Sequence, residues 1–158
     1  MRITAAPGAA QALRRKLGRS QGYFQATFRT PLRQLPLFTS TVLAAHGRPE
    51  AGSVTLEQVV FTPKNLEALL RNHDLPLTYG RDTTITVSGA RESEALLEAA
   101  WGDRLDFYFV PAPSRFQLFA DHDEYTTFFA ATKGHLAKIV TALSTADFSR
   151  VDGYQREW

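Results

Sequence analysis

The sequence contains no cysteine, which excludes disulfide bonds, thiolate metal sites and cysteine nucleophiles. It also lacks long apolar runs. The longest candidate, residues 36–45, is interrupted by Thr39, Ser40 and Thr41, and it is shorter than the roughly 20 residues that a membrane-spanning helix needs. We therefore expect a cytoplasmic protein without a membrane span, and a reducing compartment is compatible with the composition.

The signatures of several enzyme classes are missing as well. The sequence has no nucleophile elbow, no Walker loop, no dinucleotide-binding glycine pattern and no HExxH spacing. Its ten glycines are scattered singly. We therefore expect no cofactor and no metal, and these absences favour a non-enzymatic protein.

The residues that are present describe an ordinary globular domain. A chain of 158 residues is long enough for one domain that buries about two-thirds of its unfolded surface. Hydrophobic residues make up 44% and charged residues 22% of the chain, which are usual proportions for a globular protein. Eleven phenylalanines predict a core rich in aromatic rings.

Charge is distributed unevenly along the chain. Residues 1–50 hold eight Lys or Arg and one acid, Glu50, for a net charge of +7, whereas residues 51–158 carry −5. The balance changes sign in the turn-rich stretch GRPEAGS, residues 47–53. We therefore divide the chain into a basic N-terminal segment, residues 1–46, and an α+β core, residues 54–158. The basic segment is either an arm or an added helix and strand element of the same domain.

Local patterns predict alternating strands and helices. Residues 8–17 have helix-forming composition before Gly18, and their acid-free, Arg-rich character also fits an organelle import signal, so import stays open. Strands are predicted at 23–30, 54–61 and 83–87, a hairpin at 105–109 and 116–120, and an edge strand at 148–154. Helices are predicted after Thr62-Pro63 and at 90–101, while residues 37–45 fit either type. The order predicts an α+β fold: a mixed or antiparallel sheet with helices packed mainly on one face.

The clearest pattern runs from Asp121 to Leu143 and predicts a long amphipathic C-terminal helix over about residues 122–144. At about 100° per residue, apolar side chains form one stripe along it. The stripe consists of Tyr125, Phe128, Phe129, Leu136, Ile139, Val140 and Leu143. Asp121 fits the N-cap of this helix, with Glu124 completing a capping box. The opposite face has small side chains that let another element approach closely: Ala130, Gly134, Ala137 and Thr141.

Three carboxylates and an imidazole fall together at the start of this predicted helix: Asp121, His122, Asp123 and Glu124. Such a cluster suits a general acid/base pair, a small hydrolase-like site or an oxygen/nitrogen metal site. Helix capping already accounts for the carboxylates, and the other histidine of the helix, His135, lies about 20 Å away along the axis. We therefore rank catalysis or metal binding at this cluster third.

Basic residues interleaved with aromatics make nucleic-acid binding the second interpretation. The cations are Arg14, Arg15, Lys16, Arg19, Arg29 and Arg33, with Tyr23, Phe24 and Phe28 among them. A phosphate backbone with stacked bases would use this combination. The same aromatics also alternate as a buried strand face does, and no RNP1, KH or helix-turn-helix pattern accompanies them.

The interpretation that we favour is a protein–protein interaction module: an adaptor, an immunity-type protein or an assembly component, bound to a protein partner or a second copy of the chain. The small-residue face of the predicted helix, the polarised charge and the missing enzyme signatures support it. Tyr154 and Trp158 are the predicted anchors, alongside the same basic residues, because Tyr, Trp and Arg dominate interface energetics. Burial of these two aromatics within the monomer would weaken this interpretation.

Overall fold

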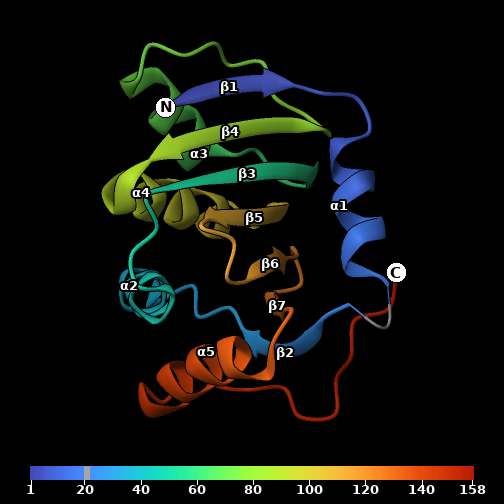
Figure 1. Ribbon diagram of the computed structural model, residues 1–158. Coiled ribbons are helices and arrows are strands. Elements are labelled where there is room, and N and C mark those ends of the chain that lie inside the picture. The colour runs from blue at the N-terminus through green and yellow to red at the C-terminus, as the bar shows by residue number, and fades with distance from the viewer. Residues whose placement is uncertain (20–21) are drawn as a thin grey trace.

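The described residues, 1–19 and 22–158 of this computed structural model, form an α+β fold with five helices and seven strands (Figure 1). The α+β class predicted from the sequence is confirmed. In chain order the elements are β1 (Arg2–Ala5), α1 (Ala9–Leu17), β2 (Phe24–Arg29), α2 (Leu35–His46), β3 (Ala51–Gln58), α3 (Lys64–Asn72), β4 (Thr83–Ser88), α4 (Gly89–Gly102), β5 (Asp106–Ala112), β6 (Gln117–Ala120), β7 (Tyr125–Ala130) and α5 (Lys133–Thr145). None of these helices is long and apolar enough to cross a bilayer.

The seven strands form one sheet in the order β1-β4-β3-β5-β6-β7-β2, and every neighbouring pair is antiparallel. The basic N-terminal segment supplies both edge strands, because β1 pairs with β4 and β2 pairs with β7. Its α2 packs against α4 and α5. Residues 1–46 therefore complete the same sheet and the same helical layer as the rest of the chain.

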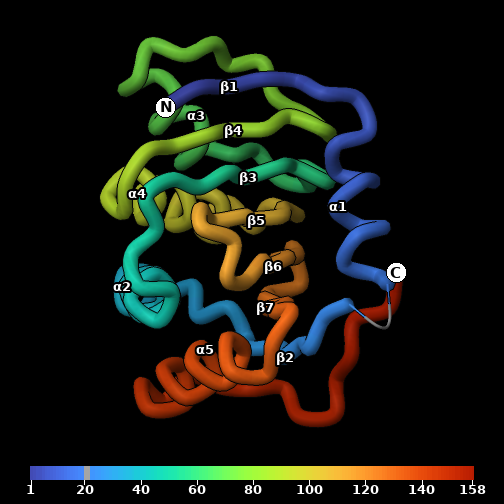
Figure 2. The backbone as a smooth tube through the Cα atoms, in the orientation of Figure 1, coloured from blue at the N-terminus to red at the C-terminus, as the bar shows by residue number. Residues whose placement is uncertain are grey.

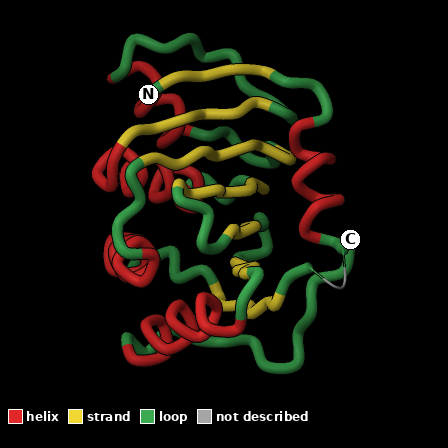
Figure 3. The backbone as a smooth tube through the Cα atoms, in the orientation of Figure 1, coloured by secondary structure: helices red, strands yellow, loops and turns green. Residues whose placement is uncertain are grey.

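The two faces of the sheet are covered unequally (Figures 1 and 3). The helices α2, α3, α4 and α5 build the main core on one face, where Phe128 of β7 meets Phe38 of α2 and Phe107 of β5 meets Trp101 of α4. On the other face α1 lies without a second helix beside it, and a smaller cluster forms around Tyr108 and Phe119. The prediction that helices pack mainly on one face is confirmed.

The predicted long helix is wrong in its first half. Residues 121–124 form a turn, β7 occupies Tyr125–Ala130, and α5 begins only at Lys133. Thr132 caps α5, since its Oγ1 accepts a hydrogen bond from the N–H of His135 at 3.2 Å. The C-terminal helix therefore has 13 residues, and it packs on the sheet through Ile139 and Leu143.

Other local predictions hold with adjusted bounds. The strand at 23–30, the helices at 8–17 and 90–101, and the hairpin of β5 and β6 are confirmed. The ambiguous stretch 37–45 is helical, within α2. The predicted edge strand at 148–154 is wrong, since this stretch contributes one isolated bridge, between Phe28 and Arg150. Thr62 does not cap α3, whose first amides instead bond to the carboxylate of Asp103.

The chain after α5 returns along the outer edge of β2 and ends beside α1 (Figure 2). The N–H of Arg29 donates to the carbonyl of Ser149 at 2.9 Å, and the N–H of Val151 donates to the carbonyl of Thr27 at 2.8 Å. These bonds satisfy part of the edge that β2 would otherwise expose to a neighbouring chain.

Candidate interaction site at the β6–β7 turn

The turn between β6 and β7 is closed by the carboxylate of Asp121. Its Oδ1 accepts hydrogen bonds from the backbone N–H groups of Asp123 and Tyr125, at 3.1 and 3.0 Å. Glu124 takes a left-handed conformation with a φ of 67°, which lets the chain reverse direction. Aspartate is favoured in such turns because its side chain bonds to the amides that follow it. The carboxylate that the sequence suggested as a helix cap therefore closes a hairpin.

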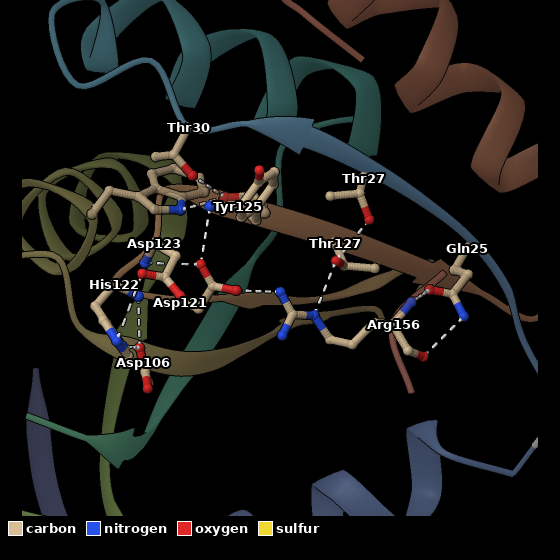
Figure 4. A network of polar contacts seen from close by, with 12 residues as sticks. Gln25, Thr27, Thr30, Asp106, Asp121, His122, Asp123, Tyr125, Thr127 and Arg156 are labelled. Carbon is tan, nitrogen blue, oxygen red and sulfur yellow. Dashed lines mark hydrogen bonds and ion pairs between the residues drawn. The ribbon is translucent and has the colours of Figure 1, made fainter. Parts of the chain in front are cut away.

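His122 is held by Asp106, the first residue of β5. One oxygen, Oδ1 of Asp106, lies 2.7 Å from the His122 backbone nitrogen and 2.8 Å from Nδ1 of the ring (Figure 4). On the other side, Nε and Nη2 of Arg104 donate to the His122 carbonyl oxygen at 3.1 and 2.8 Å. The hydrogen bond with Asp106 is the main cause that raises the pKa of His122 above its ordinary value.

A histidine held by an aspartate can take up or release a proton, yet the surroundings of His122 favour a structural role. Its Nε2 lies 3.9 Å from a carboxylate oxygen of Asp123, and Glu124 pairs with Arg104 at 3.5 Å. Within residues 1–19 and 22–158, no group of three or more histidine, aspartate and glutamate side chains is arranged to hold a metal ion. The four residues of the predicted cluster thus stay close in space, and each has a partner inside the fold.

A second ion pair ties the turn to the segment after α5. Nη2 of Arg156 pairs with Oδ2 of Asp121, and Nε of Arg156 donates to Oγ1 of Thr127 at 3.2 Å (Figure 4). Gln25 of β2 holds the Arg156 backbone, because its side-chain amide accepts from the N–H at 2.8 Å and donates to the carbonyl at 3.4 Å. The Asp121 and Arg156 side chains are only 13% and 12% exposed, so this largely buried ion pair holds the C-terminal segment against the turn.

The outer side of the turn carries a strip of arginine and aromatic side chains. We call it the turn ridge, and it consists of Arg29, Val60, Phe61, Arg104, Glu124, Tyr125 and Tyr154. At one end, the Arg104 guanidinium lies over the exposed ring of Phe61, 5.0 Å from its centroid. The same guanidinium reaches Glu124 at 3.5 Å. This end therefore joins a loop after β3 to the turn.

The other end of the turn ridge is a stack of three side chains. The Arg29 guanidinium lies 5.1 Å from the ring centroid of Tyr125, and the Tyr125 ring stacks on Tyr154 with centroids 5.6 Å apart. The carbonyl of Glu124 accepts the N–H of Thr30 at 2.8 Å, which places β2 directly against the turn. Direct contacts and shared backbone thus connect the ridge from Phe61 to Tyr154.

The two aromatic residues predicted as anchors have different surroundings. Tyr154 is 37% exposed and belongs to the turn ridge. Trp158 packs against Phe119 and Phe129, with ring centroids 4.9 and 6.0 Å apart, in the cluster beneath α1. Trp158 therefore serves the packing of the fold, whereas Tyr154 remains open to a partner.

The six predicted cations are exposed and lie in three parts of the fold: α1 and its end, β2, and the loop between β2 and α2. Arg14 is an exposed residue of α1 whose guanidinium lies 5.5 Å from the centroid of the Trp158 ring and 3.7 Å from Glu57. Arg29 belongs to the turn ridge, and Arg33 lies in the loop that leads from β2 to α2. The remaining cations are exposed on α1 or just after it: Arg15, Lys16 and Arg19.

The small residues predicted to face a neighbour are divided between two elements. Ala130 is buried in β7, whereas Gly134, Ala137 and Thr141 are exposed on α5. These three residues border a pocket that the end of α2, including His46, completes. The small face of α5 is therefore shorter than predicted, and none of its residues belongs to the turn ridge.

The sequence did not reveal the residues that hold the turn. Asp106 and Arg104 stand on either side of a predicted strand start, and Arg156 lies between two aromatics near the end of the sequence. Their charge next to apolar strands was a signal for a polar site, but only the strand pairing shows which groups meet. No family model, curated protein or solved structure matches this chain.

Proposed function

We propose that the protein is a non-enzymatic protein–protein interaction module that binds its partner through the turn ridge. The observation that carries this proposal is a connected set of Phe, Tyr and Arg side chains on the surface around one turn, with Phe61 46% and Tyr154 37% exposed. Tyr and Arg are enriched among the residues that contribute most to binding energy, and large exposed apolar side chains gathered together often mark interaction sites.

The rigidity of the turn supports the proposal. Asp106 fixes His122, and Asp121 fixes both the turn and Arg156, so the backbone beneath the ridge is held by several hydrogen bonds. A surface that is already ordered loses less conformational entropy when it binds. The ridge also carries two arginines and one glutamate, and its complement is a partner surface with acidic groups around an apolar centre.

The proposal is tested by site-specific crosslinking in cells of the source organism. A photoreactive p-benzoylphenylalanine replaces Phe61 or Tyr154 in two variants, and Leu37 or Leu77 in two control variants, which are 53% and 41% exposed outside the ridge. We expect the two ridge variants to yield an adduct with the same protein, which is a second copy of this chain if the module is a homo-oligomer. Equal adducts at all four positions would contradict the proposal.

The purified partner then allows an affinity measurement. We expect Phe61→Ala and Tyr154→Ala each to weaken binding about tenfold or more, because truncating an interface anchor costs about 2 kcal/mol or more. Leu37→Ala and Leu77→Ala should leave the affinity within about twofold. Unchanged affinity in both ridge variants would rule out the ridge as the interface.

The purified protein also allows a test of the nucleic-acid interpretation against the turn-ridge proposal. DNA and RNA are titrated at low and at moderate salt, since binding to phosphates weakens steeply as salt rises. Salt-sensitive binding that disappears when Arg15, Lys16 and Arg19 are all changed to Ala, and that survives Phe61→Ala, would favour that interpretation over the turn ridge.

A further inference from the structure

A polar cavity of about 300 Å³ lies on the α1 side of the sheet, behind the β6–β7 turn. Residues of α1, of β3, β5 and β6, and of the segment 156–158 line it, and the rings of Tyr108, Phe119 and Trp158 supply its apolar wall. None of the turn-ridge residues lines this cavity. It is therefore separate from the turn ridge, although the residues that hold the turn form part of its wall.

Three buried polar atoms in residues that line this cavity have no hydrogen-bond partner within the described chain: Glu57 Oε2, Tyr108 Oη and Trp158 Nε1. Tyr108 is only 1% exposed. Leaving a buried hydroxyl or carboxylate oxygen without a partner costs about 1–3 kcal/mol, and folded proteins contain few such atoms. Three of them in residues around one cavity make this cavity a candidate site for a polar ligand.

Glu57 is directed toward the cavity by an irregularity in β3. The register between β3 and β5 shifts between Leu56 and Gln58, so Glu57 stands in a bulge, a feature that often re-aims a side chain near a functional site. Its Oε1 accepts a hydrogen bond from Arg81 at 3.0 Å and lies 3.7 Å from Nη1 of Arg14. The two arginines thus occupy one oxygen and leave Oε2 as a free acceptor.

The charged residues around the cavity favour a positively charged ligand. Two arginines and His122, whose pKa is raised, line the cavity, against five carboxylates: Glu57, Asp106, Asp121, Asp123 and Glu157. Excess negative charge beside low-dielectric aromatic walls concentrates cations. Burial, followed by the charge of Glu57, raises the pKa of Tyr108, so its hydroxyl stays neutral and can both accept and donate a hydrogen bond.

We propose that this cavity binds a small organic ammonium ion. The ammonium N–H groups donate to Glu57 Oε2 and Tyr108 Oη, and its hydrocarbon part lies against the aromatic wall, beside the guanidinium groups of Arg14 and Arg156 that already lie over the Trp158 and Phe119 rings. Trp158 Nε1 needs an acceptor, which a hydroxyl or carbonyl oxygen on the same ligand supplies. The ligand class is therefore an amine that also carries an oxygen acceptor, such as an amino alcohol.

The test uses three probes of the same length that differ at one end. They are 4-aminobutan-1-ol, the neutral butane-1,4-diol and the anionic 4-hydroxybutanoate, titrated by calorimetry and by ligand-observed NMR. We expect the amine to bind at least ten times more tightly than the other two. Failure of the amine to bind at millimolar concentration would mean that the cavity holds only water, and it would overturn the proposal. Equal binding of the diol, or preference for the anion, would overturn it as well.

Variants then locate the bound amine. Glu57→Gln should weaken binding at least tenfold, and Tyr108→Phe should weaken it severalfold while keeping the ring and the Glu57 ion pairs. Glu98→Gln, on α4 and away from the cavity, is the matched control and should bind as the wild type does. Circular dichroism checks that each variant is folded, and Tyr108→Phe keeps the test valid if Glu57→Gln is not. Unchanged affinity in Tyr108→Phe together with Glu57→Gln would place the amine elsewhere and overturn the proposal.

Discussion

Nδ1 of His122 lies 2.8 Å from Oδ1 of Asp106, and the same oxygen accepts the His122 backbone N–H. Since the pKa of His122 is raised, the folded state binds this proton more tightly than the unfolded state does. The resulting stabilisation is complete below the ordinary imidazole pKa of 6.5 and is lost as the pH rises through the raised value. We expect the stability advantage of the wild type over His122→Asn to shrink as the pH rises above 6.5, measured by urea denaturation from about pH 5 to about pH 9.

The comparison with His122→Asn isolates this residue from His46. Burial lowers the pKa of His46, so the folded state resists its protonation and loses stability as the pH falls below 6.5. Both proteins in the comparison contain His46, so its contribution cancels. Asparagine keeps a donor near the position of Nδ1 but cannot be protonated. A stability difference that does not change with pH would mean that the Asp106–His122 contact does not bind a proton preferentially in the folded state.

The Asp121–Arg156 pair should contribute more than an exposed ion pair of the same residue types. In a double-mutant cycle with Asp121→Asn and Arg156→Met, we expect a coupling free energy of about 1–3 kcal/mol, because both side chains are largely buried. Asparagine retains the oxygen that closes the turn. The control cycle uses Asp152 and Arg150, which are 3.6 Å apart and exposed, and it should give about 0–0.5 kcal/mol. Equal coupling in the two cycles would contradict this prediction.

The misassigned stretch 121–132 shows why periodicity was misleading here. Phe128 and Phe129 lie on opposite faces of the sheet, one in the main core and the other in the cluster beneath α1. Because α5 packs on one face of β7 and Trp158 covers Phe129 on the other, both faces are apolar and the usual alternation of a half-exposed strand disappears. Adjacent apolar residues in such a strand also fit a helical stripe. The sequence allowed only one secondary-structure interpretation for α1, α4 and the β5–β6 hairpin. These elements were predicted correctly.

The candidate site was only partly predictable for a related reason. The sequence placed Asp121 to Glu124 together because they are neighbours in the chain. Their partners come from other parts of the chain: Arg104 from the turn after α4, Asp106 from β5 and Arg156 from the segment after α5. These contacts depend on the pairing of β5, β6, β7 and β2, which local propensity does not specify. The turn ridge depends on the same pairing.

Asp103 caps a helix to which it does not belong. Its Oδ1 and Oδ2 accept the N–H groups of Asn65 and Leu66 at 3.0 and 2.7 Å, the first turn of α3, although Asp103 itself follows α4. Asp103→Ala should lower the free energy of unfolding by about 1–3 kcal/mol, because it removes two acceptors from buried amides. Asp152→Ala, at an exposed position, should change it by less than about 0.5 kcal/mol. Equal unfolding midpoints in urea for the two variants would contradict the capping role.

Phe38 links the basic N-terminal segment to the rest of the core. Its ring packs edge-on against Trp101 of α4 and Phe148 after α5, with centroids 5.0 and 5.1 Å apart, and it is fully buried. We expect Phe38→Ala to lower the free energy of unfolding by about 3–5 kcal/mol, whereas Leu37→Ala, one residue away and exposed, should change it by less than about 0.5 kcal/mol.

The shape of the unfolding transition of Phe38→Ala tests whether residues 1–46 unfold together with the rest of the chain. Phe38 belongs to residues 1–46 and contacts Trp101, Phe128 and Phe148 of the remaining chain, so the loss should appear in one cooperative transition at a lower midpoint. Calorimetry and circular dichroism should report the same midpoint. If Phe38→Ala instead separated unfolding into two transitions, residues 1–46 would be an independently folding arm, and the shared sheet would not make the two parts cooperative.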